Sequence, residues 1–83
     1  MARVFFSSGL RRLVGGGESI EIAARDVREL LRRLDARYPG LATQIGDATA
    51  IAIDGEIIPH GQALLERLRP DSEVHFLPQI GGG

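Results

Sequence analysis

The residues with the clearest chemical potential stand at the C-terminal end of the chain. An apolar run at residues 74–77 is followed by Pro78, Gln79 and Ile80, and then by three glycines that end in Gly83. Glycine adds nothing to a core and loses more entropy on ordering than any other residue. Fully extended, the five steps from Pro78 to Gly83 reach roughly 17 Å. We therefore expect a thin stalk that carries the Gly83 carboxylate into another protein's active site; the alternatives are a frayed terminus or a remnant of expression.

A carboxylate becomes an acyl donor only after activation, because its oxygen is a poor leaving group. Conversion to an acyl-adenylate supplies a good leaving group, and a sulfur nucleophile can then displace AMP to give a thiocarboxylate or a thioester. Ile80, Gly81 and Gly82 are the residues expected to thread into such a site, since glycines have no side chains and tolerate unusual backbone angles. Ordering five tail residues costs on the order of 5–10 kcal/mol. We therefore expect the folded part of the chain to dock on the partner as well.

The predicted docking surface is the sheet face that no helix covers. Strand alternation places Phe5 and Leu77 on that face. By the same alternation His75 lies on that face, between them. Exposed apolar side chains on an otherwise polar surface are typical of a binding site. The alternative is that their exposure is incidental.

No other side chains show the spacing of a catalytic or metal site. His60 and His75 have no nearby cysteine, aspartate or glutamate at triad or metal-ligand spacing. The glycines at 15–17 precede a predicted strand, and the chain has no lysine, whereas a phosphate loop needs a following helix and a lysine. We therefore expect no bound cofactor and no metal.

The composition predicts one small soluble domain. The chain has 83 residues, no cysteine and a net charge of −1, which excludes disulfides and argues against nucleic acid as the main partner. It has no apolar run long enough to span a membrane and no signal-like N-terminus, so we expect a cytoplasmic protein without a membrane partner. All ten basic residues are arginine. A GC-rich genome explains this, although a protein with an activated carboxylate also gains from lacking side-chain amines.

The first part of the chain predicts a hairpin followed by the main helix. Residues 3–7 and 18–22 alternate with the period of strands, and a long connection that ends in glycines 15–17 joins them. Asp26 is a good N-cap, with Glu29 three residues later, and Pro39-Gly40 ends the helix. The apolar stripe of this helix is formed by Val27, Leu30, Leu31, Leu34, Tyr38 and Leu41.

The second part predicts three more strands. Residues 42–48 are expected to be a short polar connection, and 49–53 a strand in the interior of the sheet. Asp54-Gly55 is a strong tight-turn signal, and residues 56–58 pair back. A brief helical turn is expected at 62–68, and the last strand at 73–77.

This order of elements predicts an α+β protein with the β-grasp (ubiquitin-like) fold. A mixed sheet of four to five strands is covered on one face by the single long helix, because no second helix of that length exists. The first and last strands are expected to run parallel in the middle of the sheet. The folded domain is predicted at residues 1–78 and the flexible glycine-rich tail at 79–83.

The whole chain resembles the ThiS/MoaD family of ubiquitin-like sulfur carriers. In that family an Asp-Gly-Asp/Glu-Val segment leads through two apolar residues and a proline to a terminal Gly-Gly. Here Ser72 replaces the usual glycine. The family pattern has one variable residue directly before the terminal Gly-Gly, and in this chain that residue is Gly81. The resemblance rests on residues 4–6, 13–15, 34–41, 71–78 and 80–83.

The resemblance implies a function for the Gly83 carboxylate. In the family, the corresponding carboxylate is adenylated by an ATP-dependent activating enzyme and converted to a thiocarboxylate. The sulfur then passes to a biosynthetic enzyme. The chain length favours the small subunit of molybdopterin synthase, whose partner is the large catalytic subunit; carriers for thiamine, cysteine or thiolated tRNA look much the same. The resemblance therefore implies a protein co-substrate and not an enzyme.

Two other functions fit the same features. The chain could be a protein modifier joined through Gly83 to lysines of target proteins, because activation of the carboxylate is common to both roles. It could also be a plain interaction domain with an inert tail.

Overall fold

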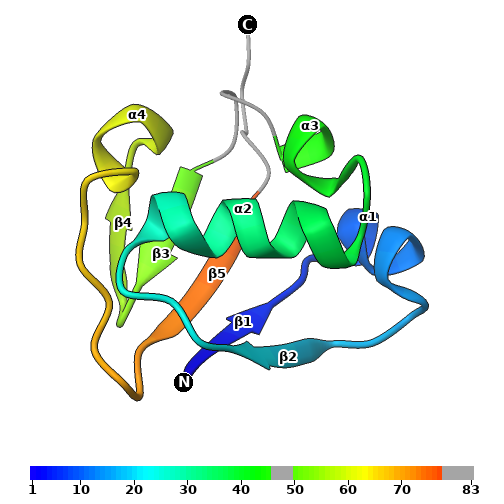
Figure 1. Cartoon of the computed structure of the whole chain (residues 1–83). Helices are drawn as coiled ribbons and strands as arrows, with labels where there is room; N and C mark the ends of the chain where they lie inside the picture. The colour runs from blue at the N-terminus through cyan, green and yellow to red at the C-terminus, as the bar shows by residue number, and fades with distance from the viewer. Residues whose placement is uncertain (46–49, 78–83) are drawn as a thin grey trace, which may run out of the picture.

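The computed structural model describes residues 1–45 and 50–77, and the elements follow one another along the chain as drawn in Figure 1. The strands are β1 (Ala2–Phe5), β2 (Ser19–Ile22), β3 (Ala50–Ile53), β4 (Glu56–Ile58) and β5 (Glu73–Leu77). The helices are α1 (Ser8–Arg11), the 3-10 turn η1 (Arg12–Val14), α2 (Val27–Arg37), α3 (Leu41–Ile45) and α4 (His60–Ala63). The predicted boundary between a domain at 1–78 and a tail at 79–83 lies outside the described residues.

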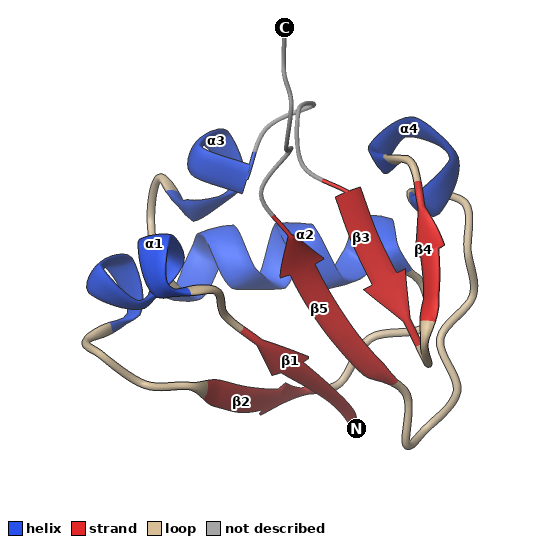
Figure 2. Ribbon diagram, turned by 180° about the vertical axis from the view of Figure 1, so that it is seen from behind, coloured by secondary structure: helices blue, strands red, loops and turns tan. Residues whose placement is uncertain are grey.

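The strands form one mixed sheet in the order β2-β1-β5-β3-β4. β1 and β5 run parallel, and the β1–β2, β3–β5 and β3–β4 pairs are antiparallel. Helix α2 lies across one face of the sheet, as the two opposite views in Figures 1 and 2 show. This is the predicted β-grasp arrangement, including the parallel pairing of the first and last strands.

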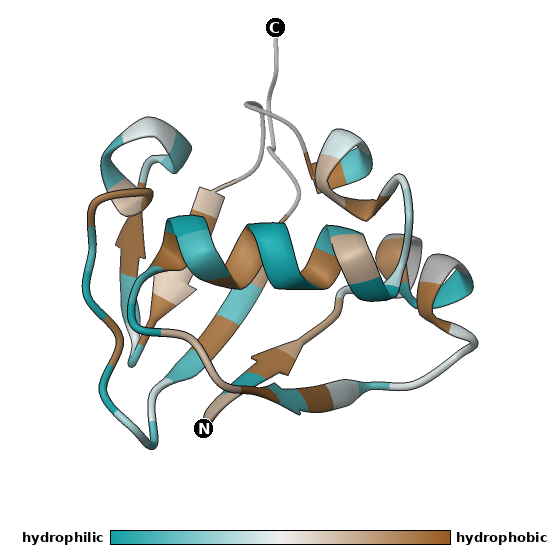
Figure 3. Ribbon diagram, in the orientation of Figure 1, coloured by the Kyte–Doolittle hydropathy of each residue, from teal (hydrophilic) through white to brown (hydrophobic). Residues whose placement is uncertain are grey.

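The core lies between α2 and the sheet. Val27, Leu30 and Leu34 of α2 are buried against inward-facing residues of the strands, among them Val4 and Val74, which are register partners. Figure 3 shows polar and apolar segments alternating along the strands and α2, and this alternation gives each element a buried and an exposed side. Within the described ranges, every helix is too short or too polar to cross a bilayer.

Helix α2 begins where the sequence predicts. The Glu29 N–H donates to Asp26 Oδ1 at 2.7 Å, and the Glu29 carboxylate accepts from the N–H of Arg25 at 2.8 Å. The capping pair therefore forms, with Glu29 reaching the residue before the N-cap. After α2 the chain turns at Gly40, whose φ of +92° suits glycine. The carboxylate of Asp35 accepts the N–H groups of Gly40 and Ala42 and so stabilises this turn.

Four local predictions need correction. Residues 42–48 are not only a polar connection, because α3 covers Leu41–Ile45 and buries Leu41 and Ile45. Leu41 accordingly belongs to this second helix and not to the stripe of α2. The connection between the first two strands contains α1 and η1. The short helix before the last strand is α4 at His60–Ala63, so it both starts and ends earlier than the predicted 62–68.

The predicted Asp54-Gly55 turn joins β3 to β4 and is also tied to β5. Both residues have positive φ, +51° and +90°, as a two-residue hairpin turn requires. Asp54 Oδ1 accepts the N–H of Glu73 at 2.9 Å, and Oδ2 accepts the hydroxyl of Ser72 at 3.0 Å and the guanidinium of Arg69 at 3.2 Å. The backbone hydrogen bond from Glu73, together with those from Ser72 and Arg69, holds the pKa of Asp54 below its ordinary value.

Replacing Ile45 tests whether α3 is part of the core. Ile45 is 1% exposed, so Ile45→Ala should lower the free energy of unfolding by about 2–4 kcal/mol through lost burial and a residual cavity. Thr43→Ala, at an exposed position of the same helix, is the matched control. Urea titrations of both variants measure the difference; equal stabilities would show that α3 is a surface loop.

Replacing Asp54 tests the tie between the β3–β4 turn and β5. Asp54→Asn keeps a residue that tolerates positive φ but loses charge-assisted hydrogen bonds, so stability at pH 7 should fall by about 1–2 kcal/mol. Because the folded-state pKa of Asp54 is lowered, its contribution is complete above a pH of about 4 and is lost as pH falls through the folded pKa. The two proteins should therefore converge in urea titrations at low pH.

Glu56→Gln is the control for this experiment, since Glu56 lies in the neighbouring strand and is exposed. It should leave both the stability at pH 7 and its decline in acid nearly unchanged. A wild-type advantage over Asp54→Asn that persists at the lowest pH would contradict the assignment.

Candidate functional site

The described part of the predicted site is the surface around β5. The tail residues Ile80, Gly81, Gly82 and Gly83 lie outside the described residues, so their predicted role stays a prediction. β5 is the middle strand of the sheet and runs directly toward Pro78 along the chain. The geometry of the site is therefore that of β5 and its two neighbours.

Phe5 and His75 lie side by side on the face away from α2. They are register partners of the parallel β1–β5 pair, and their rings stack with centroids 4.4 Å apart and planes 5° apart. Their sequence neighbours Val4, Phe6 and Val74 are buried on the α2 side, which fixes Phe5 and His75 on the opposite face. Figure 2 looks onto that face, with α2 behind the strands.

This pair is the centre of a row that crosses all five strands. On one side His75 is the partner of Ala52 in β3, and Ala52 is the partner of Ile57 in β4. On the other side Phe5 is the partner of Ser19 in β2. We call Ile57, Ala52, His75, Phe5 and Ser19 the open-face row. It is apolar over most of its length, and Ile57 at one end is 66% exposed.

Leu77 stands on the same face, two residues beyond His75. Its register partner is Ala50 of β3, and its side chain is half-buried. The structure thus brings the three predicted docking residues onto one face, with Phe5 and His75 in ring contact and Leu77 nearer the end of β5 that precedes the tail. Their docking role itself stays a prediction.

Charged residues occupy the same face on the other side of the row. Arg3 is the register partner of both Glu73 in β5 and Glu21 in β2, and its guanidinium lies 3.2 Å from the Glu21 carboxylate. The face therefore divides into an apolar part toward Leu77 and a charged part toward the start of β5. An apolar centre with a polar rim is the usual composition of a protein interface.

Sequence reasoning missed Ala52 and Ile57. Both were recognised only as strand residues, because placing them beside His75 requires the register of β3 against β5 and β4. The one available signal was that Ile57 follows a tight turn and must face the opposite side of the sheet from its neighbour Ile58, which is buried.

Residues 1–45 and 50–77 contain no group of three or more histidine, cysteine or acidic side chains placed to hold a metal ion. His75 is part of the open-face row, whereas His60 is the first residue of α4. The histidines are thus on separate elements.

Solved structures that are similar over nearly the whole chain include the following three. A chain of the Amycolatopsis orientalis BexX/CysO complex is 19% identical, with a TM-score of 0.86 and 100% coverage of both chains. The small archaeal modifier protein 1 (SAMP1) from Methanosarcina acetivorans is 24% identical, with a TM-score of 0.84, covering 99% of this chain and 95% of that one. A chain of the complex of subunits 1 and 2 of molybdopterin-converting factor from Helicobacter pylori is 27% identical, with a TM-score of 0.68 and coverages of 99% and 97%.

The comparison with curated proteins gives no significant match. The model of the ThiS family, in contrast, matches residues 4–83. That match begins in β1, passes through Phe5, His75 and Leu77, and includes the terminal glycines. The chain therefore belongs to the ThiS family and is a ubiquitin-like sulfur carrier with the β-grasp fold.

Proposed function

We propose that this carrier works through its Gly83 carboxylate, which a partner enzyme adenylates with ATP and converts to a thiocarboxylate for sulfur donation. The observation that carries the proposal is the family match, which continues to Gly83 through three glycines that follow β5 after Pro78, Gln79 and Ile80. No side chain of the chain is needed as a catalyst. The protein is a co-substrate of its partners.

The proposed reaction has two steps. The Gly83 carboxylate oxygen attacks the α-phosphorus of ATP, pyrophosphate leaves, and an acyl-adenylate forms. A sulfur nucleophile then attacks the carbonyl carbon, and AMP leaves with the electron pair of the C–O bond. When the nucleophile is hydrosulfide, it loses its proton and the product is a terminal thiocarboxylate. Gly82 and Gly83 suit this chemistry because their lack of side chains lets the carbonyl carbon enter a narrow site.

We assign the docking of the folded part to the open-face row and Leu77. Ordering the five tail residues costs about 5–10 kcal/mol of conformational entropy. A tail with few side chains makes too few contacts to offset that cost. Phe5, His75 and Leu77 are half-buried in the free protein, so a partner that covers them removes more apolar surface from water. The aromatic pair is prearranged by its stacking, which lowers the entropy lost on binding.

For the sulfur acceptor we propose molybdopterin synthesis, with the large subunit of molybdopterin synthase as the receiving enzyme. Support comes from the similarity to a chain of the molybdopterin-converting factor complex, at 27% identity. The similarity to a chain of the BexX/CysO complex keeps other biosynthetic acceptors, including those of thiamine, cysteine and thiolated tRNA, as the alternatives. Activation by ATP requires a compartment that supplies it, which we take to be the cytoplasm.

The second candidate function is attachment to other proteins through Gly83. It is favoured by the similarity to a small archaeal modifier protein and by chemistry, because a lysine amine can attack the same acyl-adenylate. The chain has no lysine of its own and so cannot form side-chain-linked polymers of itself. Isopeptide bonds between Gly83 and lysines of cellular proteins would support this role, and a thiocarboxylate without such bonds would oppose it.

Intact-mass measurement tests the proposed chemistry. After incubation with ATP, the cognate activating enzyme and a sulfide source, the mass should rise by the difference between one sulfur and one oxygen atom. Deletion of Gly83 should abolish this change, whereas Gln79→Ala, upstream of the glycines, should leave it intact. An unchanged mass in the presence of a demonstrably active enzyme would contradict the proposal.

The docking surface is tested by the same reaction under initial-rate conditions. Phe5→Ala should raise the KM of the carrier about tenfold, equivalent to ~1.4 kcal/mol, and change kcat little, because it removes binding area and leaves the carboxylate untouched. Leu65→Ala is the matched control, since Leu65 is 77% exposed and lies outside the open-face row. Equal KM values for the two variants would show that the row is not the docking surface.

A further inference from the structure

β2 presents one side without a strand partner in the described chain, because it is the first strand of the sheet order. The N–H of Phe6 donates to the carbonyl of Glu18 at 2.9 Å. In an antiparallel pair, residues alternate between those that bond to the neighbouring strand and those that do not. Ser19, Glu21 and, just beyond the strand, Ala23 therefore direct their N–H and C=O groups to the free side.

The edge of β2 has four residues and lacks proline, lysine and a bulge, three of the features that usually prevent strand pairing. Edge strands are commonly protected by proline, lysine, bulges or very short length. β2 contains neither proline nor lysine, and its register with β1 is continuous from Ser19 to Ile22. The opposite edge of the sheet differs, since β4 has only three residues and is followed at once by Pro59. Of the two edges, β2 is therefore the one open to a further strand.

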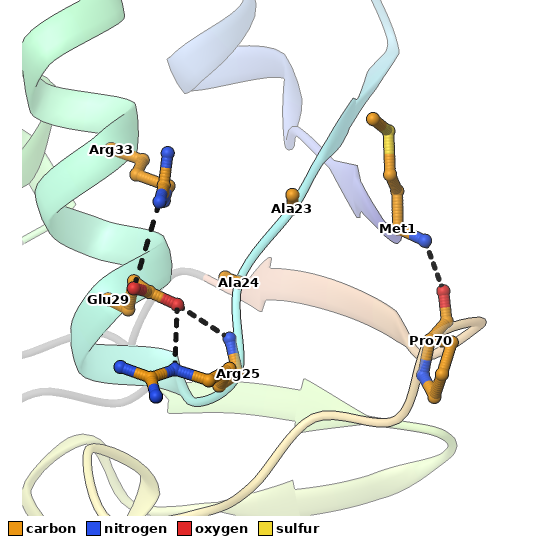
Figure 4. Close-up of a pocket in the computed structure, with 7 residues that line it drawn as sticks. All are labelled: Met1, Ala23, Ala24, Arg25, Glu29, Arg33 and Pro70. Carbon is orange, nitrogen blue, oxygen red and sulfur yellow. Dashed lines mark hydrogen bonds and ion pairs between the residues drawn. The ribbon is translucent and has the colours of Figure 1, made fainter.

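A shallow hollow of about 470 Å³ adjoins the end of β2. It is lined by Met1, Ala23, Ala24, Arg25, Glu29, Arg33 and Pro70. Figure 4 shows the stretch from Ala23 to Arg25 passing between the charged side chains of α2 and the Met1–Pro70 pair. In the described chain, no backbone hydrogen bond of a turn or loop involves Ala23 or Ala24. The free side of β2 thus continues into the hollow.

The helix side of this hollow is basic. The carboxylate of Glu29 is shared by three guanidiniums, those of Arg25 at 3.8 Å, Arg32 at 3.6 Å and Arg33 at 3.8 Å. Of these residues, Arg25, Glu29 and Arg33 line the hollow. Their two positive charges and one negative charge leave +1 at its wall, and Arg32 adds a further positive charge nearby. Arg25 and Arg33 are 86% and 54% exposed, so most of their N–H groups face solvent and can donate to a further carboxylate.

The neighbouring hollow on the far side of Met1 has the opposite sign. Its lining includes Arg3 but also the carboxylates of Glu21, Asp71 and Glu73. An acidic side chain is therefore favoured on the side of α2 and disfavoured on the side of the open sheet face. This difference in charge determines that a segment lying along β2 should be acidic, and that its acidic side chains should face α2.

We propose that the free edge of β2 binds an extended acidic segment of a partner protein, which adds as a sixth strand and places a carboxylate between Arg25 and Arg33. Backbone hydrogen bonds to Ser19, Glu21 and Ala23 supply the pairing, and the arginines select the charge. The segment carries its acidic residues on the α2 side and uncharged residues on the side of Glu21.

This edge site is separate from the open-face row. The row uses side chains on the face of the sheet, whereas the edge site uses backbone groups and the flank of α2. Met1 precedes β1, which runs parallel to β5, so the hollow lies toward the start of β5 and Leu77 lies at its other end. The two surfaces can therefore be occupied at the same time, and the edge site does not depend on sulfur transfer.

The test uses two blocked synthetic peptides, one alternating Glu with Val and the other alternating Lys with Val. In titrations followed by amide NMR, the Glu peptide should protect the N–H groups of Ser19, Glu21 and Ala23 from exchange, and the Lys peptide should not. Arg33→Ala should weaken binding of the Glu peptide about five- to tenfold and reduce its salt dependence. Arg28→Ala should leave binding unchanged, because Arg28 is exposed on the same helix but does not line the hollow.

Ala23→Pro removes one outward N–H beside the hollow without removing a charged group. It should weaken binding of the Glu peptide and leave the oxygen-to-sulfur mass change at Gly83 intact. Failure of the edge site and failure of the carrier chemistry are therefore distinguishable. Equal binding of the two peptides, perturbations confined to Phe5, His75, Ala52 and Ile57, or an equal effect of Arg28→Ala and Arg33→Ala would each overturn the proposal. Concentration-dependent protection of the edge without peptide would identify a second copy of the chain as the occupant instead.

Discussion

The parallel pairing of β1 with β5 is the constraint on which the rest of the structure depends. It places the first and last described strands side by side in the middle of the sheet. Two parallel strands cannot be joined by a tight turn, so the chain between them must cross over, and α2 covers the sheet on the way. The same pairing sets Phe5 directly beside His75. One register therefore determines the core, the open-face row and the strand from which the tail follows.

Much of this arrangement could be predicted from the sequence because strong local signals coincide with the fold. Asp26 and Glu29 predict the start of α2, and Asp54-Gly55 predicts the β3–β4 turn. Both signals depend only on residues that are close in the sequence. α3 was missed because its two buried residues, Leu41 and Ile45, are set among polar ones in a helix of little more than one turn. So short a helix is held by tertiary packing and leaves almost no periodicity to read.

The candidate site divides in the same way. Alternation along single strands was enough to place Phe5, His75 and Leu77 on one face, since parity needs no knowledge of neighbouring strands. The contribution of Ala52 and Ile57 depends on the relative shift of three strands, which no local pattern encodes. The hollow beside Ala23 depends further on how α2 lies against the end of β2. Each step from strand to sheet to surface thus requires contacts between residues that are far apart in the sequence.

The central position of β5 has a mechanical consequence. Any partner that draws in the residues after Leu77 pulls along the axis of β5. That strand is hydrogen-bonded on both sides, to β1 and to β3, so the load falls on two ladders at once and in shear, and many bonds must break together before the strand can slide. A strand at the edge would instead peel away bond by bond. The domain is thus built to remain folded while its end is under tension.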